Sequence, residues 1–444
     1  MLALLLACTG AAPSVSDSAV PSPDVPYTRQ RAPLAEQSPA GRAWKRGIIH
    51  LHSPFSHDAC DGDPMPDGVP REDCLADLRA GLCADAIDFA FLTDHPAQAA
   101  YQPYADLMLN RDDDEDVDGI AKRLHCDTGT TTLWMPGIED ELMPIGLDRH
   151  VTEDAAENDR IYNNVDQETF DAEIAAGGLV LQAHTEGKDL ATLLERQAMG
   201  LAGVEMFNLH AMVDPTKREE DLGLDPYDWL TAISPWVTGT TDAEPDLVFL
   251  GFYQAQDVSL ERWDALSAVS PTVGTAGTDA HQNALPSPMR DGERVDSYRR
   301  MMRWFSNVAL VDADTPAAYQ EAIAAGRLFV AFEALGTPSG WDVHYGDLEM
   351  AGTAPVGDAL VVSCPTLSAD SPQMGEAPEI SVTVYRDGVA WHEGCGTLPV
   401  TEAGVYRAVA TITPHHLRTF LDTEADALIV PYPWLYSNAF RIGL

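Results

Sequence analysis

Basic residues are scarce in this sequence. Its 444 residues include 27 lysines and arginines against 70 aspartates and glutamates, which gives a formal net charge of -43. A field of this sign repels the phosphate backbone of nucleic acids and anionic membrane surfaces. We therefore expect no nucleic-acid partner, and a nuclease or a polymerase-associated proofreading domain is disfavoured.

Long hydrophobic runs are also missing. No segment approaches the roughly 18 consecutive apolar residues of a membrane-spanning helix. The N-terminal stretch "MLALLLACTG" is apolar but short, and no Lys or Arg precedes it, unlike an ordinary signal peptide. Its Leu-Leu-Ala-Cys tetrapeptide still resembles the cleavage box of bacterial lipoproteins. We expect residues 1–8 to be a lipoprotein signal segment, with Cys8 as a lipid anchor that holds an exported protein at the cell envelope or outer surface; an accidental match or a truncated start is the alternative.

Residues 9–41 are rich in proline, serine and alanine. This composition is typical of chain that cannot bury enough apolar surface to fold, and it favours a tether between an anchor and a folded body. We expect residues 9–41 to form a disordered linker.

No cysteine pair has the CxxC spacing of common zinc and redox motifs. Once Cys8 is set aside, six cysteines remain: Cys60, Cys74, Cys83, Cys126, Cys364 and Cys395. An even set in an exported protein indicates disulfides, whereas in a cytosolic protein the same residues would be buried thiols. We expect Cys364 and Cys395 to pair because they lie in a separate C-terminal region, and the pairing of the others stays open.

Residues 42–336 alternate short apolar runs with helical patterns. Strand-like runs include "GIIHLH", "AIDFAFLTD", "LVLQAH" and "GVEMFN", and Leu75, Leu78 and Leu82 form an apolar stripe on one predicted helix. This alternation predicts parallel strands joined by right-handed crossovers, with both faces of the sheet covered. Residues 337–444 instead contain short β-rich segments between turns, which predicts a small all-β, sandwich-like domain.

Two histidines one residue apart follow the first apolar run, in "RGIIHLH". Side chains at alternate positions of an extended segment point the same way, so His50 and His52 can converge on one metal. Other potential ligands follow later strand-like runs: Asp58, His95, Glu139, His150, His184, Asp279 and His281. In a barrel, the carboxyl ends of the strands meet at one face. The pattern therefore predicts a site for several metals at that face.

As a set, the motifs "HLHSPFSHDA", "LTDH", "GIEDE", "DRH", "AH" and "GTDAH" resemble the PHP superfamily, named for polymerase and histidinol phosphatase domains. The resemblance covers roughly residues 46–281. It implies a distorted (β/α)7 barrel with two or three divalent metals. The ending "PWLYSNAFRI" also looks like the tail of exported PHP proteins near the carbaryl-hydrolase-like metallohydrolases.

The resemblance also implies how the ligands are shared among the metals. They would be His50, His52, Glu139 and Asp279 for the first metal, the bridging Glu139 with His150 and His184 for the second, and His95, His281 and Asp58 (or its neighbour His57) for the third. Mixed imidazole and carboxylate ligands suit zinc, manganese or iron.

Adjacent metals lower the pKa of a shared water and provide hydroxide near neutral pH. We therefore expect a hydrolase that uses metal-held hydroxide on a small phosphoester, or on a carboxylic or carbamic ester. Glu139 and His210 are the expected catalytic residues, although His210 could instead be an ordinary core histidine. The alternative function is that of a non-catalytic, metal-containing surface protein that binds through its β domain.

Overall fold

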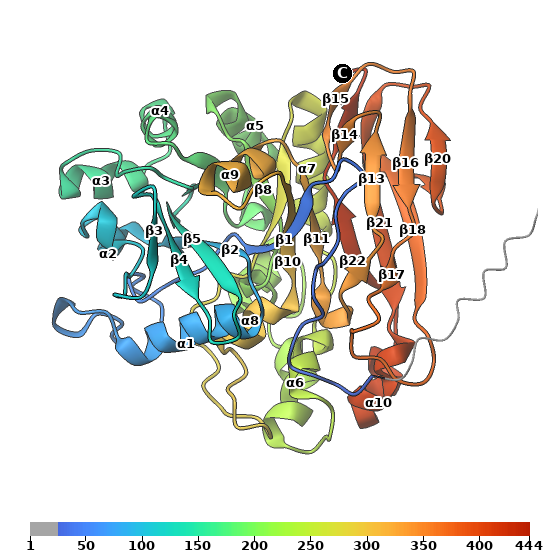
Figure 1. The fold of residues 1–444 in the computed structure, drawn as a ribbon, viewed down its shortest axis with the longest axis horizontal. Coiled ribbons are helices and arrows are strands. Elements are labelled where there is room, and N and C mark those ends of the chain that lie inside the picture. The colour runs from blue at the N-terminus through green and yellow to red at the C-terminus, as the bar shows by residue number, and fades with distance from the viewer. Residues whose placement is uncertain (1–24) are drawn as a thin grey trace, which may run out of the picture.

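The computed structural model describes residues 25–444, and Figure 1 shows them as a mixed α/β fold. The predicted signal segment and the lipid anchor at Cys8 lie outside these residues. Within the described part of the chain, no helix is both long and apolar enough to cross a membrane.

Residues 42–336 contain the strands and helices that position the site. The strands are β1 (Ala43–Ile48), β2 (Phe89–Asp94), β3 (Glu115–Val117), β4 (Ala121–His125), β5 (Thr131–Ile138), β6 (Met143–Ile145), β7 (Leu179–Gln182), β8 (Gly203–Asn208), β9 (Val273–Gly277), β10 (Ser306–Val311) and β11 (Leu328–Ala331). The helices are α1 (Glu72–Ala84), α2 (Pro96–Ala99), α3 (Ala155–Tyr162), α4 (Gln167–Ala175), α5 (Leu190–Met199), α6 (Asp228–Thr238), α7 (Asp257–Val269), α8 (Tyr298–Trp304) and α9 (Pro316–Ala324).

Strand pairing runs from β10 through β1, β2, β5, β6, β7 and β8 to β9. A bridge between Leu51 and Ala280 then brings the segment after β9 beside the segment after β1. The pairs β1–β2, β2–β5, β7–β8 and β8–β9 are parallel, as expected. The all-parallel expectation is wrong at β10, which is antiparallel to β1 and β11, and at β6, which is antiparallel to both neighbours. Residues 139–142 are too few for the crossover that a parallel neighbour requires.

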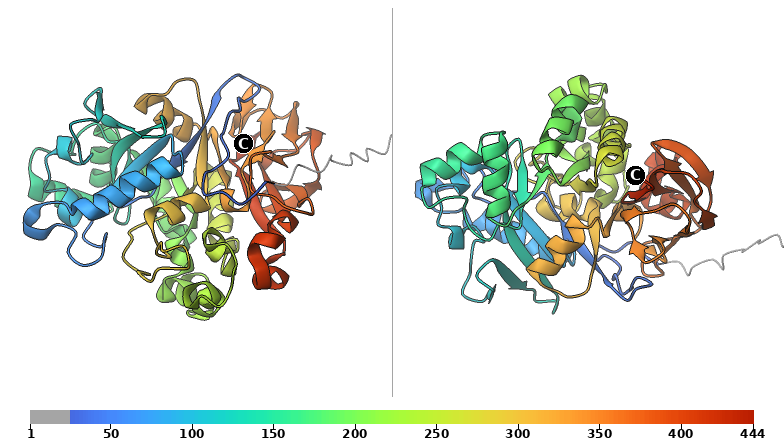
Figure 2. Two further views of the ribbon diagram at one scale, coloured as in Figure 1. Left: turned by 60° about the horizontal axis from the view of Figure 1, so that its bottom comes forward. Right: turned by 90° about the horizontal axis from the view of Figure 1, so that it is seen from above.

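The C-terminal part is rich in strands, as expected. They are β12 (Pro338–Ser339), β13 (Asp342–Tyr345), β14 (Leu348–Glu349), β15 (Gly352–Ala354), β16 (Ala359–Ser363), β17 (Thr366–Leu367), β18 (Glu379–Arg386), β19 (Val389–Glu393), β20 (Gly396–Pro399), β21 (Gly404–Thr413), β22 (Tyr432–Ser437) and β23 (Phe440–Ile442), with the short helices α10 (Arg418–Leu421) and α11 (Ala425–Leu428). Figures 1 and 2 show them beside the helix-covered body. Strand β22 pairs with β11, so one continuous sheet joins the two regions.

Residues 25–41 differ from the expected disordered linker. Arg31 is buried, and its Nη1 donates to Ser306 Oγ at 2.8 Å and to Glu333 at 3.2 Å. The ring of Tyr27 packs against Phe420 of α10, with centroids 5.3 Å apart. Composition predicted disorder, but these few contacts hold Arg31 against the body and Tyr27 against helix α10.

Six cysteines of the described residues form three disulfides: Cys60–Cys74, Cys83–Cys126 and Cys364–Cys395. The pairing expected for Cys364 and Cys395 is confirmed. Disulfides persist in oxidising compartments and are rare in reducing ones. The structure therefore indicates an oxidising, extracytoplasmic environment.

A buried charge cluster at the end of β11 ties the N-terminal segment to the sheet. Glu333 accepts hydrogen bonds from Arg46 Nε at 2.8 Å and Nη2 at 2.7 Å, and it also faces Arg31. Burial alone would raise the pKa of Glu333, but Arg46 and Arg31 outweigh it and lower the pKa to about 2. Glu333 therefore stays ionised, and its removal would leave Arg46 without its closest counter-charge and Arg31 with only the more distant Asp85, at 3.9 Å.

We predict that Glu333→Gln lowers the free energy of unfolding at neutral pH by roughly 3–5 kcal/mol, the cost of breaking a buried pair. Because the folded-state pKa is depressed, this stabilisation is complete above the unfolded pKa of about 4.3 and is lost as the pH falls toward 2. Urea unfolding at a series of pH values measures it. Glu157→Gln, which breaks an exposed pair with Arg160, is the control and should change little. Equal losses in both variants would contradict the role of the cluster.

Candidate metal centre

The predicted ligands lie where strands end. His50 and His52 follow β1, His95 follows β2, and Glu139 follows β5. His184 comes after β7, and Asp279 and His281 come after β9. Backbone bonds align the two segments that carry most of them: Asp279 N donates to His50 O at 3.1 Å, and His52 N donates to Ala280 O at 3.2 Å. The sheet thus brings residues far apart in the sequence to one place.

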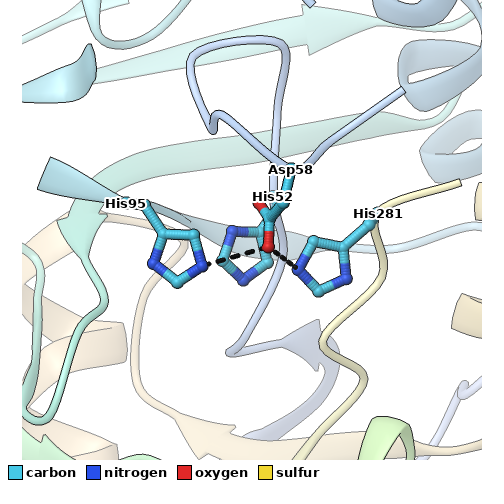
Figure 3. A group of neighbouring side chains, drawn as sticks. All are labelled: His52, Asp58, His95 and His281. Atoms are coloured by element: carbon cyan, nitrogen blue, oxygen red, sulfur yellow. Dashed lines mark hydrogen bonds and ion pairs between the residues drawn. The ribbon is translucent and has the colours of Figure 1, made fainter. Parts of the chain in front are cut away.

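Four side chains form the group shown in Figure 3: His52, Asp58, His95 and His281. One potential ligand atom from each lies within 4.8 Å of all the others. Asp58 Oδ2 is 3.2 Å from His95 Nε2 and 3.1 Å from His281 Nε2. Asp58, and not its exposed neighbour His57, belongs to this group.

A second group combines His50, His52 and Glu139, all buried. The Nε2 atoms of His50 and His52 face each other at 3.1 Å, and both lie near Asp279 Oδ1, at 3.4 Å and 3.2 Å. Two imidazole nitrogens turned toward one carboxylate oxygen provide converging lone pairs when the rings are neutral. This arrangement suits a cation.

Glu139 lies between the two groups. Its Oε2 is 2.9 Å from His95 Nδ1, and its Oε1 is 3.8 Å from His184 Nε2. Oε2 is buried and has no hydrogen-bond partner among the described residues, because His95 Nδ1 bonds instead to the Glu139 carbonyl at 2.8 Å. Burial alone would raise the pKa of Glu139, but His95 and His50 lower it to about 2. A buried, ionised carboxylate whose two oxygens face different histidines fits a bridging metal ligand.

Asp279 also contacts the remaining histidines. Its Oδ2 is 3.2 Å from His184 Nε2 and 3.0 Å from His210 Nδ1. His210, Asp279 and His281 form a third group with ligand spacing. His210 was expected to transfer protons, and the structure places it close enough to be a ligand as well.

The histidine pKa values reflect the surrounding carboxylates. Burial lowers the pKa of His50, but Asp279 and Glu205 raise it to about 9. Burial also lowers the pKa of His95, yet Asp58 and Glu139 raise it to about 11. His52 differs, because burial and the nearby His281 lower its pKa to about 3. In the metal-free protein, protons on His50 and His95 balance the buried carboxylates, a role that divalent cations would take over.

The backbone is strained at two of these positions. His184 and Asp279 have φ values of 49° and 50°, in the left-handed region that non-glycine residues rarely adopt. Such strain persists only where surrounding contacts enforce it, and it is concentrated at functional sites. Here it turns both side chains toward the same centre.

The ligand prediction for His150 is wrong in this structure. Its Nε2 bonds to the Gln102 carbonyl at 2.9 Å, and its Nδ1 lies 3.3 Å from the Tyr162 hydroxyl. Both ring nitrogens are therefore used by protein groups. His150 belongs to none of the metal-like groups formed by residues 25–444. Its segment, "GLDRH", packs against α2 and α3 instead of entering the site.

Sequence reasoning missed Glu205. This buried residue of β8 accepts from His50 Nδ1 at 2.7 Å with Oε1, and from His184 N at 2.9 Å with Oε2. A Cβ added at Gly277 would lie 1.9 Å from Glu205 Oε1, so glycine is needed there. One sequence signal was present: a carboxylate in "GVEMFN", a strand predicted to be buried on both faces, needs a polar partner.

Glu186 was also missed. Its Oε1 lies 3.1 Å from His184 Nδ1, so His184 Nε2 is left to face Asp279 and Glu139. Carboxylates that hold the second nitrogen of a ligating histidine fix its tautomer and ring orientation.

Comparison with known proteins gives only distant matches. No protein-family model and no curated protein matches the sequence. A two-domain protein from Bacteroides vulgatus, described as containing a predicted PHP-like metal-dependent phosphoesterase, aligns over 91% of this chain and 98% of its own, at 10% identity and a TM-score of 0.37. PsfC from Pseudomonas syringae aligns over 63% of this chain and 88% of its own, at 12% identity and a TM-score of 0.33. These similarities are too distant to assign a family or an activity.

We predict that Glu205→Gln weakens metal binding by roughly 10- to 100-fold, because the ligand geometry of His50 depends on this carboxylate. Titration of metal-free protein with Zn²⁺ or Mn²⁺ in a calorimeter measures it. Glu173→Gln is the matched control, since Glu173 is a buried carboxyl on α4. An unchanged affinity in Glu205→Gln would show that His50 needs no such support.

We predict opposite results for two histidine variants. His184→Ala should lower the metal content, because His184 faces both Asp279 and Glu139. His150→Ala should keep it, because both ring nitrogens already bond to protein groups. Elemental analysis of both purified variants decides the matter. Loss of metal only in His150→Ala would restore the assignment made from sequence.

Proposed function

We propose that this protein is a metal-dependent hydrolase of the PHP type that cleaves a small phosphoester or another small ester. The observation that carries the proposal is the group of His52, Asp58, His95 and His281, which adjoins the buried Glu139 and Asp279. Such a concentration of imidazole and carboxylate groups has no evident structural purpose without cations. The Leu51–Ala280 bridge, which brings the segment after β9 beside the segment after β1, supports the proposed distorted (β/α)7 barrel.

The donor set fits two or three divalent ions of zinc, manganese or iron. We assign His50, His52, Glu139 and Asp279 to one position, and His95, His281 and Asp58 to another. His184 remains a donor, as predicted, whereas both ring nitrogens of His150 already bond to protein groups. When bound, adjacent divalent ions act as Lewis acids on the ester and lower the pKa of a nearby water.

The chain's own residues orient this centre. Ser56 Oγ lies 2.9 Å from His52 Nδ1 and donates to Asp58 Oδ1 at 2.8 Å, which links two ligands of the group in Figure 3. When His210 Nδ1 donates to Asp279, the neutral ring keeps a lone pair on Nε2. The His210 side chain is 36% exposed, so this atom can accept a proton from water or return one to a leaving group.

We also propose that the protein acts outside the cytoplasm on small molecules and not on nucleic acid. The three disulfides and the net charge of -43 support this. The proposed lipid anchor at Cys8 rests on the N-terminal sequence alone.

We predict that metal-replete protein hydrolyses small chromogenic phosphate or carboxylate esters, that a chelator abolishes this activity, and that an added divalent metal restores it. Glu139→Ala should lose both activity and metal, because it removes the carboxylate between the two groups. Ester assays paired with elemental analysis measure both quantities.

The control for this prediction is duplex DNA, which the negative field should keep away. Efficient cleavage of DNA with no turnover of any small ester would contradict the proposed substrate class. A fully metallated and active Glu139→Ala variant would contradict the bridging role.

A further inference from the structure

A small cavity opens beside the metal centre. His210, Asp279 and His281 lie at one end of it, and they form one of the groups with ligand spacing. The rest of its wall comes from the segment after β8, from residues 249–252, from the loop after β9 and from α8. A molecule held at the metal centre would therefore have this cavity next to its reacting atoms.

Most of the remaining wall is apolar. It is lined by Leu209, Val213, Phe249, Phe252, Leu285 and Met301, of which Val213 and Leu285 are half-buried. Phe249 and Phe252 pack against each other with ring centroids 5.4 Å apart, and they also contact Trp304 and Trp229 respectively. Because these rings are already packed, the cavity is preformed.

The polar residues of the wall bond to other protein groups, and Asn283 Nδ2 donates to the Asp58 carbonyl. Gln282 donates to Asp77 and accepts from Tyr298 N. Asp296 Oδ2 accepts from the backbone N–H groups of Ala284 and Leu285, at 2.7 Å each. Within the described residues 25–444, no lysine or arginine lines the cavity. Apart from the end formed by the candidate ligands, the wall offers no positive charge to an anion.

The cavity is also small. Its volume is about 40 Å³, well below the roughly 150 Å³ of an apolar cavity that binds benzene. It can take a short alkyl group but not an aromatic ring. Each buried methylene stabilises a complex by about 0.8 kcal/mol, so even a few carbons would matter for selectivity.

We propose that this cavity is a subsite for a short alkyl group carried on the acid side of the substrate, bonded directly to the reacting phosphorus or carbonyl carbon. The inference rests on the proposed hydrolase function and names its substrate class. It is placed on the acid side because His210, Asp279 and His281 line the same cavity as the apolar side chains, so an alkyl group there lies next to the candidate ligands. Hydrolysis then joins the oxygen of water to phosphorus or carbon, breaks the bond to the ester oxygen and leaves a proton on the released alcohol.

Two readouts test the subsite. Calorimetry with Mn²⁺-loaded protein compares methyl-, propyl- and octylphosphonate, which keep the alkyl group on phosphorus. Affinity should rise by roughly 15-fold from methyl to propyl, at about fourfold per methylene, and octyl should bind no better than propyl. The p-nitrophenyl esters of acetate, butyrate and octanoate should show the same order in kcat/KM.

Variants of the wall decide whether the cavity is responsible. Val213→Phe fills it and should abolish the advantage of propyl over methyl. Leu285→Ala enlarges it and should shift the preference toward longer chains, which gives a second test if the first variant folds poorly. Val269→Phe, at an exposed valine at the end of α7, is the control.

The outcomes separate the two proposals. If esters are hydrolysed without any dependence on chain length, or if Val213→Phe and Val269→Phe behave alike, the subsite is disproved and the hydrolase function stands. If phosphonates bind with the predicted order but no ester is hydrolysed, the cavity binds alkyl groups as proposed and the hydrolase function fails. A chain-length effect confined to the alcohol side would also overturn the inference.

Discussion

The arrangement of the site depends on one carboxylate, that of Asp279. Its Oδ1 lies 3.2 to 3.4 Å from the Nε2 atoms of three histidines, and its Oδ2 lies within 3.2 Å of two more. The five are His50, His52, His281, His184 and His210. The side chain is only 2% exposed, and although burial alone would raise its pKa, the surrounding histidines hold it well below its usual range. The buried carboxylate of Asp279 thus contacts imidazole rings that follow four different strands.

The fold supplies the constraint that keeps Asp279 there. Its N–H bonds to the carbonyl of His50, and the Thr278 hydroxyl donates to the same carbonyl. The left-handed backbone at Asp279 then turns the carboxylate toward the histidines. Glu205 and Gly277 pack against the His50 ring on the side away from Asp279, and these contacts fix the position of the ring. Strand pairing, backbone strain and hydrogen bonds from neighbouring side chains together fix the positions of the Asp279 carboxylate and the His50 ring. A preorganised site requires such support.

Much of this could be predicted from the sequence, because local patterns carry it. Strand runs such as the one before His95 are apolar and are followed by polar residues. This pattern predicts that the ligands gather at the carboxyl ends of the strands, even when the exact topology is unknown. The pairing of Cys364 with Cys395 could also be predicted, because these two cysteines lie in a C-terminal region apart from the other four. His150 could not be placed, because no local pattern reveals whether a loop histidine turns inward or bonds to a carbonyl such as that of Gln102.

Other features depend on contacts between distant segments. The antiparallel β6 follows from a short connection, which could have been counted, but the anchoring of Arg31 by Glu333 joins residues about three hundred positions apart. The apolar cavity beside His210 likewise combines the segment after β8, the loop after β9 and α8. Composition and periodicity describe residues that are close along the chain. They therefore do not predict contacts between residues that are far apart in the sequence.

The central claim is that cations take the place where these histidines and carboxylates converge. The most direct measurement is X-ray diffraction from crystals grown with Mn²⁺ or Zn²⁺, recorded on both sides of the metal's absorption edge. The account predicts at least two anomalous peaks, one within ligand distance of Asp58, His95 and His281, and one within ligand distance of His50 and Asp279. Well-ordered crystals of metal-saturated protein with no peak at these residues would contradict it.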